Sequence, residues 1–442
     1  MPIPSCGTLK DPDGRSSHDA APVVDGATGG NDVTGERGAV DLDADQPTLG
    51  LVKQLSVGLG HTCALLSGGK VRCWGNGAFG QLGYGDTETV GDDETPAMRG
   101  DVQVGLLAVQ VVASESHSCA VTGAGTIRCW GNGDDGKLGY GNTDTIGDDE
   151  TPASVRDIDV DVGGFVVQAA AGTAHTCVLL DTQKVRCWGE GIFGQLGYGN
   201  TDTIGDNEAP RLAGDVDVGG PVAQIVAGGV RTCARLVSGA VRCWGATPLG
   251  YGIDEAIGDD ETPSLAGDVP LGGLATDISA GQWHVCAVLT NGAVRCWGFP
   301  VEGELGYGNT KTIDSGDTPA SLGDVPLGGT AVQVSAGASH TCARLDDGNV
   351  KCWGNGRVGQ LGYASKKNVG VDNTPADMGT VKVGGKVGSI YAGGAVTCAL
   401  FENRRVRCWG EQLDGALGYG RPLSGPIGDD EDPDTLEVVP IF

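Results

Sequence analysis

The tripeptide Cys-Trp-Gly occurs seven times along this chain, at intervals of 53 to 58 residues. A period of this size is typical of solenoids, propellers and other repeat architectures. Each unit contains four short segments that read as strands, separated by turns rich in glycine, asparagine and aspartate, which are hairpin signals. Four-stranded antiparallel sheets repeated radially form a β-propeller. The sequence therefore predicts an all-β fold, a seven-bladed β-propeller of four-stranded antiparallel blades. The repeated tryptophans are Trp74, Trp130, Trp188, Trp244, Trp297, Trp353 and Trp409.

The two ends of the repeated region favour a closed ring. An open solenoid would need atypical polar caps at both ends. Here residues 51–57 match the first strand of the unit, and residues 436–442 form a strand-like segment where the fourth strand is due. We expect these segments to meet and to close the ring in one shared blade, so that residues 51–442 form the propeller.

Residues 1–50 fall outside the repeat and are acidic and rich in glycine, aspartate and alanine. This composition predicts a disordered tail or linker. The segment lacks the pattern of a signal peptide. However, Ile-Pro-Ser-Cys ending at Cys6 loosely resembles the end of a bacterial lipoprotein signal, so a lipid anchor at Cys6 is an open alternative. No run of 18 apolar residues occurs, so we expect no transmembrane segment.

Fourteen of the 15 cysteines form pairs ten residues apart, and only Cys6 is left over. With Gly68 at the centre of the first turn, Cys63 directly faces Cys73 across a hairpin. The Cα atoms of such a pair lie about 4.5 Å apart, at the short limit of disulfide geometry. A cross-strand disulfide is therefore predicted in every blade. The predicted bridges join Cys63 with Cys73, Cys119 with Cys129, Cys177 with Cys187, Cys233 with Cys243, Cys286 with Cys296, Cys342 with Cys352, and Cys398 with Cys408.

Zinc binding is the competing interpretation, because His61 would share one hairpin face with the first cysteine pair. The fourth and seventh units carry Arg231 and Val396 in place of this histidine and still keep both cysteines. We therefore favour disulfides over zinc, with reduced packing thiols as a further alternative. Disulfides persist in oxidising compartments, so we expect a secreted, periplasmic or cell-surface protein.

The pattern GxxHT, the longer VRCWGxGxxGQLGYG and the later Thr-Pro together resemble the regulator of chromosome condensation repeat family. The resemblance implies a seven-bladed propeller over about residues 51–442. The family includes a nuclear nucleotide-exchange factor, a plant ultraviolet photoreceptor and a secreted bacterial inhibitor of β-lactamases. The paired cysteines and the acidic charge look like its bacterial extracellular members.

Residues that recur around a ring are expected to be structural, and those that do not recur are the candidates for function. The histidine of His-Thr and the tyrosine of Leu-Gly-Tyr-Gly belong to the first class. If the chain reverses at every strand, the AGxxH turn and the long loop after Cys-Trp-Gly emerge on the same face. We predict a binding face there, formed by residues that do not recur: Phe79, Phe193, Arg231, Trp283, Phe299 and Arg357. The shortened loop of the fourth unit is expected to notch this rim.

Three units carry the sequence Gly-Asp-Asp-Glu-Thr-Pro in the long loop. Clustered carboxylates are what Ca²⁺ requires, although the spacing is not that of an EF-hand. A solvated turn with aspartate side chains capping backbone N–H groups is the favoured interpretation. Calcium is kept as an alternative, and no other cofactor is expected. The candidate ligands are Asp92, Asp93, Glu94, Asp148, Asp149, Glu150, Asp259, Asp260 and Glu261.

These observations predict a non-enzymatic extracellular binding or adhesion module that presents one propeller face to a protein or a polysaccharide. The formal charge of −28 argues against nucleic acid as a partner, and we expect none, because nucleic-acid affinity comes largely from lysine and arginine. A secreted inhibitor of the β-lactamase-inhibitor type is the alternative, followed by an enzyme or an envelope scaffold. No nucleophile elbow, P-loop or HExxH motif occurs, and the carboxylates recur with the repeat. We expect a monomer.

Overall fold

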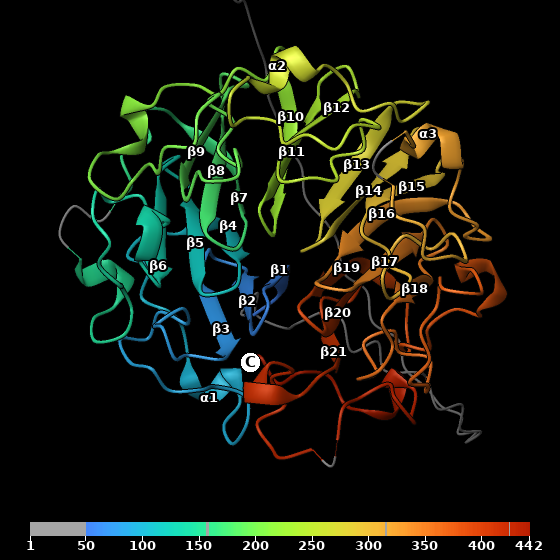
Figure 1. Ribbon diagram of the computed structural model, residues 1–442. Helices are drawn as coiled ribbons and strands as arrows, with labels where there is room; N and C mark the ends of the chain where they lie inside the picture. Colours follow the sequence, from blue (N-terminus) through green and yellow to red (C-terminus); the bar gives the residue numbers. More distant parts are fainter. Residues whose placement is uncertain (1–49, 156–158, 314–315, 424) are drawn as a thin grey trace, which may run out of the picture. The chain divides into compact units, whose positions relative to one another are not determined.

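The computed structural model describes residues 50–155, 159–313, 316–423 and 425–442, which form seven antiparallel sheets around a common centre (Figure 1). We number the blades along the chain. Their strands, from the centre outward, are β1 Val52–Val57, β2 His61–Leu66 and β3 Val71–Gly75; β4 Ala108–Ala113, β5 His117–Thr122 and β6 Ile127–Gly131; β7 Val166–Ala171, β8 His175–Leu180 and β9 Val185–Gly189; β10 Val222–Gly228, β11 Arg231–Leu236 and β12 Val241–Gly245; β13 Ala275–Ala280, β14 His284–Leu289 and β15 Val294–Gly298; β16 Ala331–Ala336, β17 His340–Leu345 and β18 Val350–Gly354; β19 Val387–Gly393, β20 Val396–Phe401 and β21 Val406–Gly410.

Helical structure among the described residues is limited to single turns. Most of these turns begin at the proline that ends the long loop, where the fixed φ of proline suits the first helical position. None of the described helices is long and apolar enough to cross a membrane. The helical turns are α1 Pro96–Arg99, α2 Pro263–Ala266, α3 Pro319–Leu322, η1 Asp134–Gly136, η2 Pro152–Ser154, η3 Pro210–Leu212, η4 Pro375–Asp377, η5 Leu413–Gly415 and η6 Pro433–Thr435.

The prediction of seven blades is confirmed, but the prediction of four strands per blade is wrong, because each described sheet has three. The expected fourth segment lies beside the third strand and shares only one ladder hydrogen bond with it. In the first blade the Val102 N–H donates to the Val71 carbonyl at 2.8 Å. Two residues later the Val104 N–H turns back to the Val102 carbonyl at 3.0 Å, which forms a γ-turn. This turn bends the segment away, so the ladder ends there.

The ring closes where the two terminal segments meet, as expected, but they do not share a blade. Strand β1 belongs to the first sheet, whereas Val439 donates to Val406 in the seventh blade at 2.8 Å. Across the junction Arg72 donates to the Ile441 carbonyl, as Arg128 does to the Val104 carbonyl between blades one and two. Each blade is thus one continuous segment of chain, and closure repeats an ordinary contact between blades. The predicted tail, except Gly50, and the candidate anchor Cys6 lie outside the described residues.

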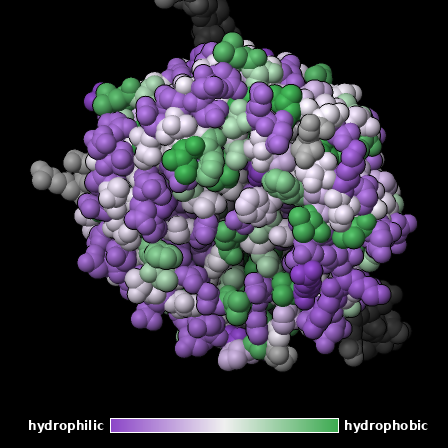
Figure 2. Space-filling view, in the orientation of Figure 1, coloured by the Kyte–Doolittle hydropathy of each residue, from purple (hydrophilic) through white to green (hydrophobic). Residues whose placement is uncertain are grey.

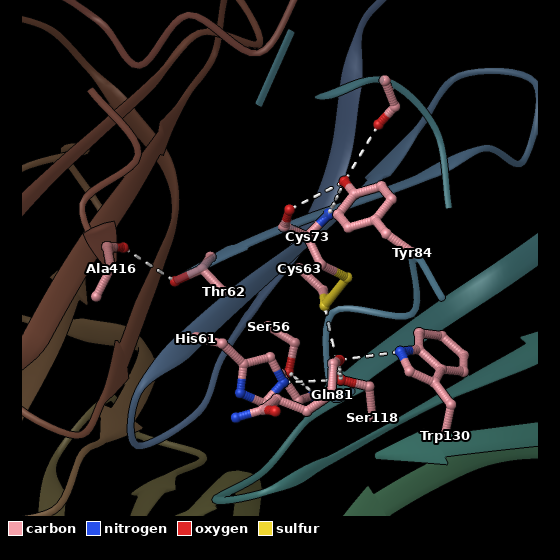
Figure 3. Close-up of a disulfide and its surroundings, with 12 residues drawn as sticks. Ser56, His61, Thr62, Cys63, Cys73, Gln81, Tyr84, Ser118, Trp130 and Ala416 are labelled. Carbon is pink, nitrogen blue, oxygen red and sulfur yellow. Dashed lines mark hydrogen bonds between the residues drawn. A yellow bond between two sulfur atoms is a disulfide. The ribbon is translucent and has the colours of Figure 1, made fainter. Parts of the chain in front are cut away.

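All seven predicted disulfides are present, with Cα–Cα distances of 4.0–4.1 Å. Strand register places the two cysteines of each hairpin directly opposite each other, and every one of these cysteines is fully buried. The Tyr84 hydroxyl lies against the first hairpin, where it accepts from the Cys73 N–H at 3.2 Å and donates to the Cys73 carbonyl at 3.0 Å (Figure 3). The tyrosine is therefore structural, as predicted. The observed bridges join Cys63 with Cys73, Cys119 with Cys129, Cys177 with Cys187, Cys233 with Cys243, Cys286 with Cys296, Cys342 with Cys352, and Cys398 with Cys408.

The recurrent histidines link neighbouring blades. His61 Nε2 lies 2.7 Å from the Ser118 hydroxyl of the second blade, and that hydroxyl donates to the Gln81 carbonyl at 2.9 Å (Figure 3). Trp130 Nε1 donates to the same carbonyl at 2.9 Å. The link recurs in the pairs His117–Thr176, His175–Thr232, His284–Thr341 and His340–Thr397. We call these five contacts the histidine belt, and they establish the predicted structural role.

Candidate functional site

The two predicted faces of the propeller are defined by hydrogen bonds between loops. On one face the turn between the first and second strands meets the long loop after the third strand, as when the Asn76 N–H donates to the Gly60 carbonyl at 2.9 Å. On the other face the hairpin turn meets the start of the next blade, as when the Ala108 N–H donates to the Gly69 carbonyl at 2.8 Å. We call these the loop face and the hairpin face. The expected grouping of the turns and long loops is confirmed.

Three predicted aromatic residues stand exposed on the loop face: Phe79, Phe193 and Trp283, with exposed fractions of 49%, 44% and 45%. The two phenylalanines are held alike by a buried glutamine two residues on. Gln81 Oε1 accepts from the Phe79 N–H at 2.8 Å, and Gln195 does the same for Phe193. Because the glutamine fixes the backbone, each ring is presented to solvent on a loop that is already ordered.

The fifth blade brings Trp283 and Phe299 together, from the turn between β13 and β14 and from the loop after β15. Their ring centroids lie 6.3 Å apart at an interplanar angle of 69°, which is an edge-to-face contact. Phe299 is half-buried, and its ring packs against that of the exposed Trp283. Arg357, from the sixth blade, is also exposed on this face and pairs with Glu302 at 3.2 Å.

The prediction that Arg231 belongs to the exposed binding face is wrong, because its exposed fraction is 1%. Its guanidinium donates to the carbonyls of Ala246, Thr247 and Gln282 at 2.8, 2.6 and 3.0 Å. Ala246 and Thr247 lie in the shortened loop of the fourth unit, and Gln282 lies in the first turn of the fifth blade. The long arginine side chain reaches all three carbonyls. Burial lowers the pKa of Arg231 to about 10, so the side chain stays charged at neutral pH.

The sequence analysis did not explain why arginine replaces the recurrent histidine at position 231. The fifth blade nevertheless carried a signal for this replacement. The fifth blade has Val285 where the described belt hydroxyls stand in other blades, so a histidine at position 231 would find no hydroxyl there. The loss of the histidine and the loss of its partner thus occur together. Arg231 fills the notch that the shorter loop leaves.

Further apolar residues of the loop face were missed by the sequence analysis. Ile192, Val301 and Leu413 are all more than half exposed on the long loops of blades three, five and seven. Their position in the variable part of the loop was visible in the sequence, but not that they point outward. One face of the molecule shows such apolar residues in small groups between hydrophilic ones (Figure 2).

The centre of the ring holds a cavity of about 290 Å³ that is lined by the innermost strands and the loop-face turns. The glutamine side chains of the innermost strands hydrogen-bond to the backbone of the neighbouring blade. Gln54 Nε2 donates to the Val111 carbonyl and Gln54 Oε1 accepts from the Val111 N–H, both at 3.1 Å. In the fifth blade Asp277 stands at the same position, and desolvation raises the pKa of its carboxyl group. Among the described residues that line this cavity there is no histidine to pair with it for acid–base chemistry.

The predicted calcium ligands converge as three separate clusters, one in each Gly-Asp-Asp-Glu loop. In every cluster the three carboxylates offer oxygens within 4.8 Å of one another. A fourth cluster, Asp429 with Asp430 and Glu431, has the same geometry and came from a variant of the motif. Desolvation, followed by the adjacent aspartate, raises the pKa of Glu94 to about 7. The solvated turn stays the favoured interpretation of these loops, and calcium binding stays the alternative.

We expect Ca²⁺ to raise the melting temperature if these loops bind it, since binding to the native state alone stabilises that state. The measurement compares 1 mM CaCl₂ with excess EDTA at constant ionic strength and pH. Replacing Asp93 and Glu94 by their amides should remove part of the shift, whereas the exposed Asp202→Asn should not. Identical melting curves with Ca²⁺ and with EDTA would contradict the prediction.

Comparison with known proteins matches the chain to one family of repeats. The family described as "Regulator of chromosome condensation (RCC1) repeat" matches residues 52–81, 108–137, 125–179, 166–195, 275–304 and 331–360. The ultraviolet-B receptor UVR8 of Arabidopsis thaliana is 31% identical over 395 residues, which cover 87% of this chain and 83% of UVR8. The human E3 ubiquitin-protein ligase HERC2 is 31% identical over 300 residues, 66% of this chain but only 6% of HERC2.

Two solved structures share the fold at 20% sequence identity. Yeast RCC1 (Prp20), determined with Kap60 bound, has a TM-score of 0.60 and covers 78% of both chains. Human WBSCR16 has a TM-score of 0.61, over 80% of this chain and 86% of its own. The fourth and seventh blades, whose His-Thr histidine is replaced, lie outside the ranges that match the family.

Proposed function

Because the chain belongs to the regulator of chromosome condensation repeat family, we propose that it is a non-enzymatic binding module that presents its loop face to a protein partner in an oxidising, extracellular compartment. The observation that carries the proposal is the set of exposed aromatic side chains Phe79, Phe193 and Trp283 on ordered loops. Aromatic residues dominate the energetic centres of protein interfaces, and prior ordering lowers the entropic cost of binding.

Two further observations support this proposal. Solved relatives with this fold bind proteins: yeast RCC1 is seen with Kap60, and Prp20p is described with its binding to Gsp1p and histones. The seven buried disulfides favour a compartment in which such bonds persist. The formal charge of −28 favours a partner with a basic or apolar contact surface.

The test is a variant that removes the three aromatic anchors together, Phe79→Ser, Phe193→Ser and Trp283→Ser. We expect capture of the partner from the native extracellular fraction to fall by roughly ten-fold or more, because each anchor is a candidate hot spot. The melting temperature should change little, since all three rings are about half exposed. Quantitative mass spectrometry after mild crosslinking measures the capture.

The matched control is a hairpin-face variant, Leu107→Ser with Phe165→Ser, whose side chains are exposed to a similar extent. This variant should capture the same proteins as the native chain. Equal loss from both variants, or no loss from the loop-face variant, would contradict the proposal. If a glycan array instead shows binding that depends on the three anchors, the loop face is still the binding surface, and the partner is a polysaccharide instead of a protein.

A further inference from the structure

The seventh blade lacks an ion pair that the first five blades share. In those blades an arginine of the third strand donates through Nε to an aspartate that directly precedes the valine of the fourth segment, at 2.6–2.9 Å. The pairs are Arg72–Asp101, Arg128–Asp159, Arg186–Asp215, Arg242–Asp268 and Arg295–Asp324. In the seventh blade the arginine is Arg407, and Val438 stands directly before Val439 in place of the aspartate.

The sixth blade also lacks this ion pair, but backbone carbonyls replace the aspartate there as acceptors. Its basic residue is Lys351, and the ammonium group donates to the carbonyls of Pro375 and Met378 at 2.8 and 2.9 Å. Arg407 is compensated only in part, and its guanidinium carbon lies 5.7 Å from the centroid of the Phe401 ring. Its two terminal nitrogens donate to the Val383 and Leu436 carbonyls, but its Nε is buried without a hydrogen-bond partner among the described residues.

Arg407 and Val438 both line a pocket of about 310 Å³. Two other cations line it as well, Lys386 and Arg405, against a single carboxylate, Glu402. The pocket is therefore positive on a chain whose formal charge is −28. At the position of Lys386 the first three blades carry Leu51, Leu107 and Phe165, so this cation belongs to the seventh blade specifically.

We propose that this hairpin-face pocket binds an oxyanion, which supplies to Arg407 the negative charge that aspartate supplies in the first five blades. Arg405 and Lys386 are its further cationic ligands. The Lys386 ammonium group donates to the Asp347 carbonyl at 3.0 Å and has two more N–H groups for a ligand. Sulfate, phosphate and carboxylate share the charge and the acceptor oxygens that a guanidinium prefers. The site is separate from the loop face and does not depend on the function proposed there.

The test uses inorganic sulfate, phosphate and acetate as probes with the full chain, at an ionic strength held constant with NaCl. We expect calorimetric titration to show one saturable site, and the order of the three affinities will separate tetrahedral oxyanions from carboxylates. Arg405→Gln should weaken binding roughly ten-fold, the effect of losing one charge-assisted hydrogen bond. Val438→Asp should restore the ion pair of the first five blades, raise the melting temperature in buffer without these anions, and abolish binding.

The matched control is Lys184→Gln in the third blade. Lys184 occupies the position of Arg405, but the neighbouring Arg186 already has Asp215 as its partner. This variant should bind the probes as the native chain does. If Val438→Asp does not fold, the double variant Lys386→Gln with Arg405→Gln serves in its place and should show no saturable site. Absence of saturable binding to the native chain, or equal affinity in Arg405→Gln, would overturn the proposal.

Discussion

Complete reduction of the seven disulfides is expected to lower the melting temperature of the propeller by roughly 10 to 20 °C. Each bridge joins cysteines ten residues apart, and a loop of this length is worth about 2.5 kcal/mol in the chain-entropy model. The seven together reach at most about 17 kcal/mol, because they need not add. A propeller of this size unfolds with an entropy of about 0.8 kcal/mol/K, which converts that free energy into the stated shift.

The experiment has to expose the sulfur atoms first, since all fourteen cysteines are fully buried. Reduction in denaturant, alkylation-free refolding in reductant and calorimetry give the shift against the oxidised protein. The control is the same reductant added to the folded protein and removed before heating, which should leave the melting curve unchanged. Non-reducing peptide mapping should return the seven pairs seen here. A reduced protein that melts like the oxidised one would contradict the prediction.

Repetition explains why much of this molecule could be predicted. Seven copies of one pattern specify the blade, the cysteine register and the division into two faces, because each copy tests the others. The sequence-based predictions failed where the backbone, or a single blade, departs from that pattern. The turn at Val104 ends the fourth strand although the residues still alternate. Alternation reports which side chains are buried and does not report where the ladder of hydrogen bonds stops.

The candidate sites show the same limit. Phe79 and Trp283 were found because they do not recur, and the structure leaves them exposed. Arg231 does not recur either, yet it is buried, because a loop shorter by three residues left carbonyls that needed a donor. The pocket beside Arg407 was invisible in the sequence, since the absence of an aspartate at position 438 has meaning only after the blades are superposed on their shared hydrogen bonds. A residue that departs from the repeat therefore indicates a local change in one blade. Only the structure distinguishes a residue that compensates for a local structural change from one that is exposed for binding.

The histidine belt should make the protein sensitive to acid between pH 6.5 and pH 4. The hydroxyl of Ser118 donates to the Gln81 carbonyl, so it accepts from the His61 Nε2–H. Nδ1 of His61 is buried with no hydrogen-bond partner among the described residues, and a second proton would have no acceptor there. Desolvation lowers the pKa of His61, His175 and His340 to about 4, and of His284 to about 3. The pKa of His117 is also lowered well below its usual value.

The sign of the effect follows from these lowered pKa values. The unfolded chain binds protons near pH 6.5, whereas the folded belt stays neutral until about pH 4, so stability is present above pH 6.5 and declines as the pH falls through this window. At pH 5 the loss is about 2 kcal/mol per histidine. The four glutamates of the acidic loops act in the opposite direction, because a raised pKa favours the folded state on acidification. These glutamates are only half-buried and solvent screens them, so the fully buried histidines should prevail.

Melting temperatures from pH 7.5 to pH 4.5 at constant ionic strength measure this decline, and calorimetry in two buffers counts the protons taken up on unfolding at pH 5. The seventh blade supplies the matched variant, because Val396 occupies the histidine position there. His175→Val leaves the Thr232 hydroxyl bonded to the Gln195 carbonyl at 2.9 Å and should therefore fold. It should remove about one fifth of the pH dependence, and His175→Val with His340→Val about two fifths. A melting temperature that stays constant from pH 7 to pH 5, or a slope that the double variant leaves unchanged, would show that the belt does not control acid stability.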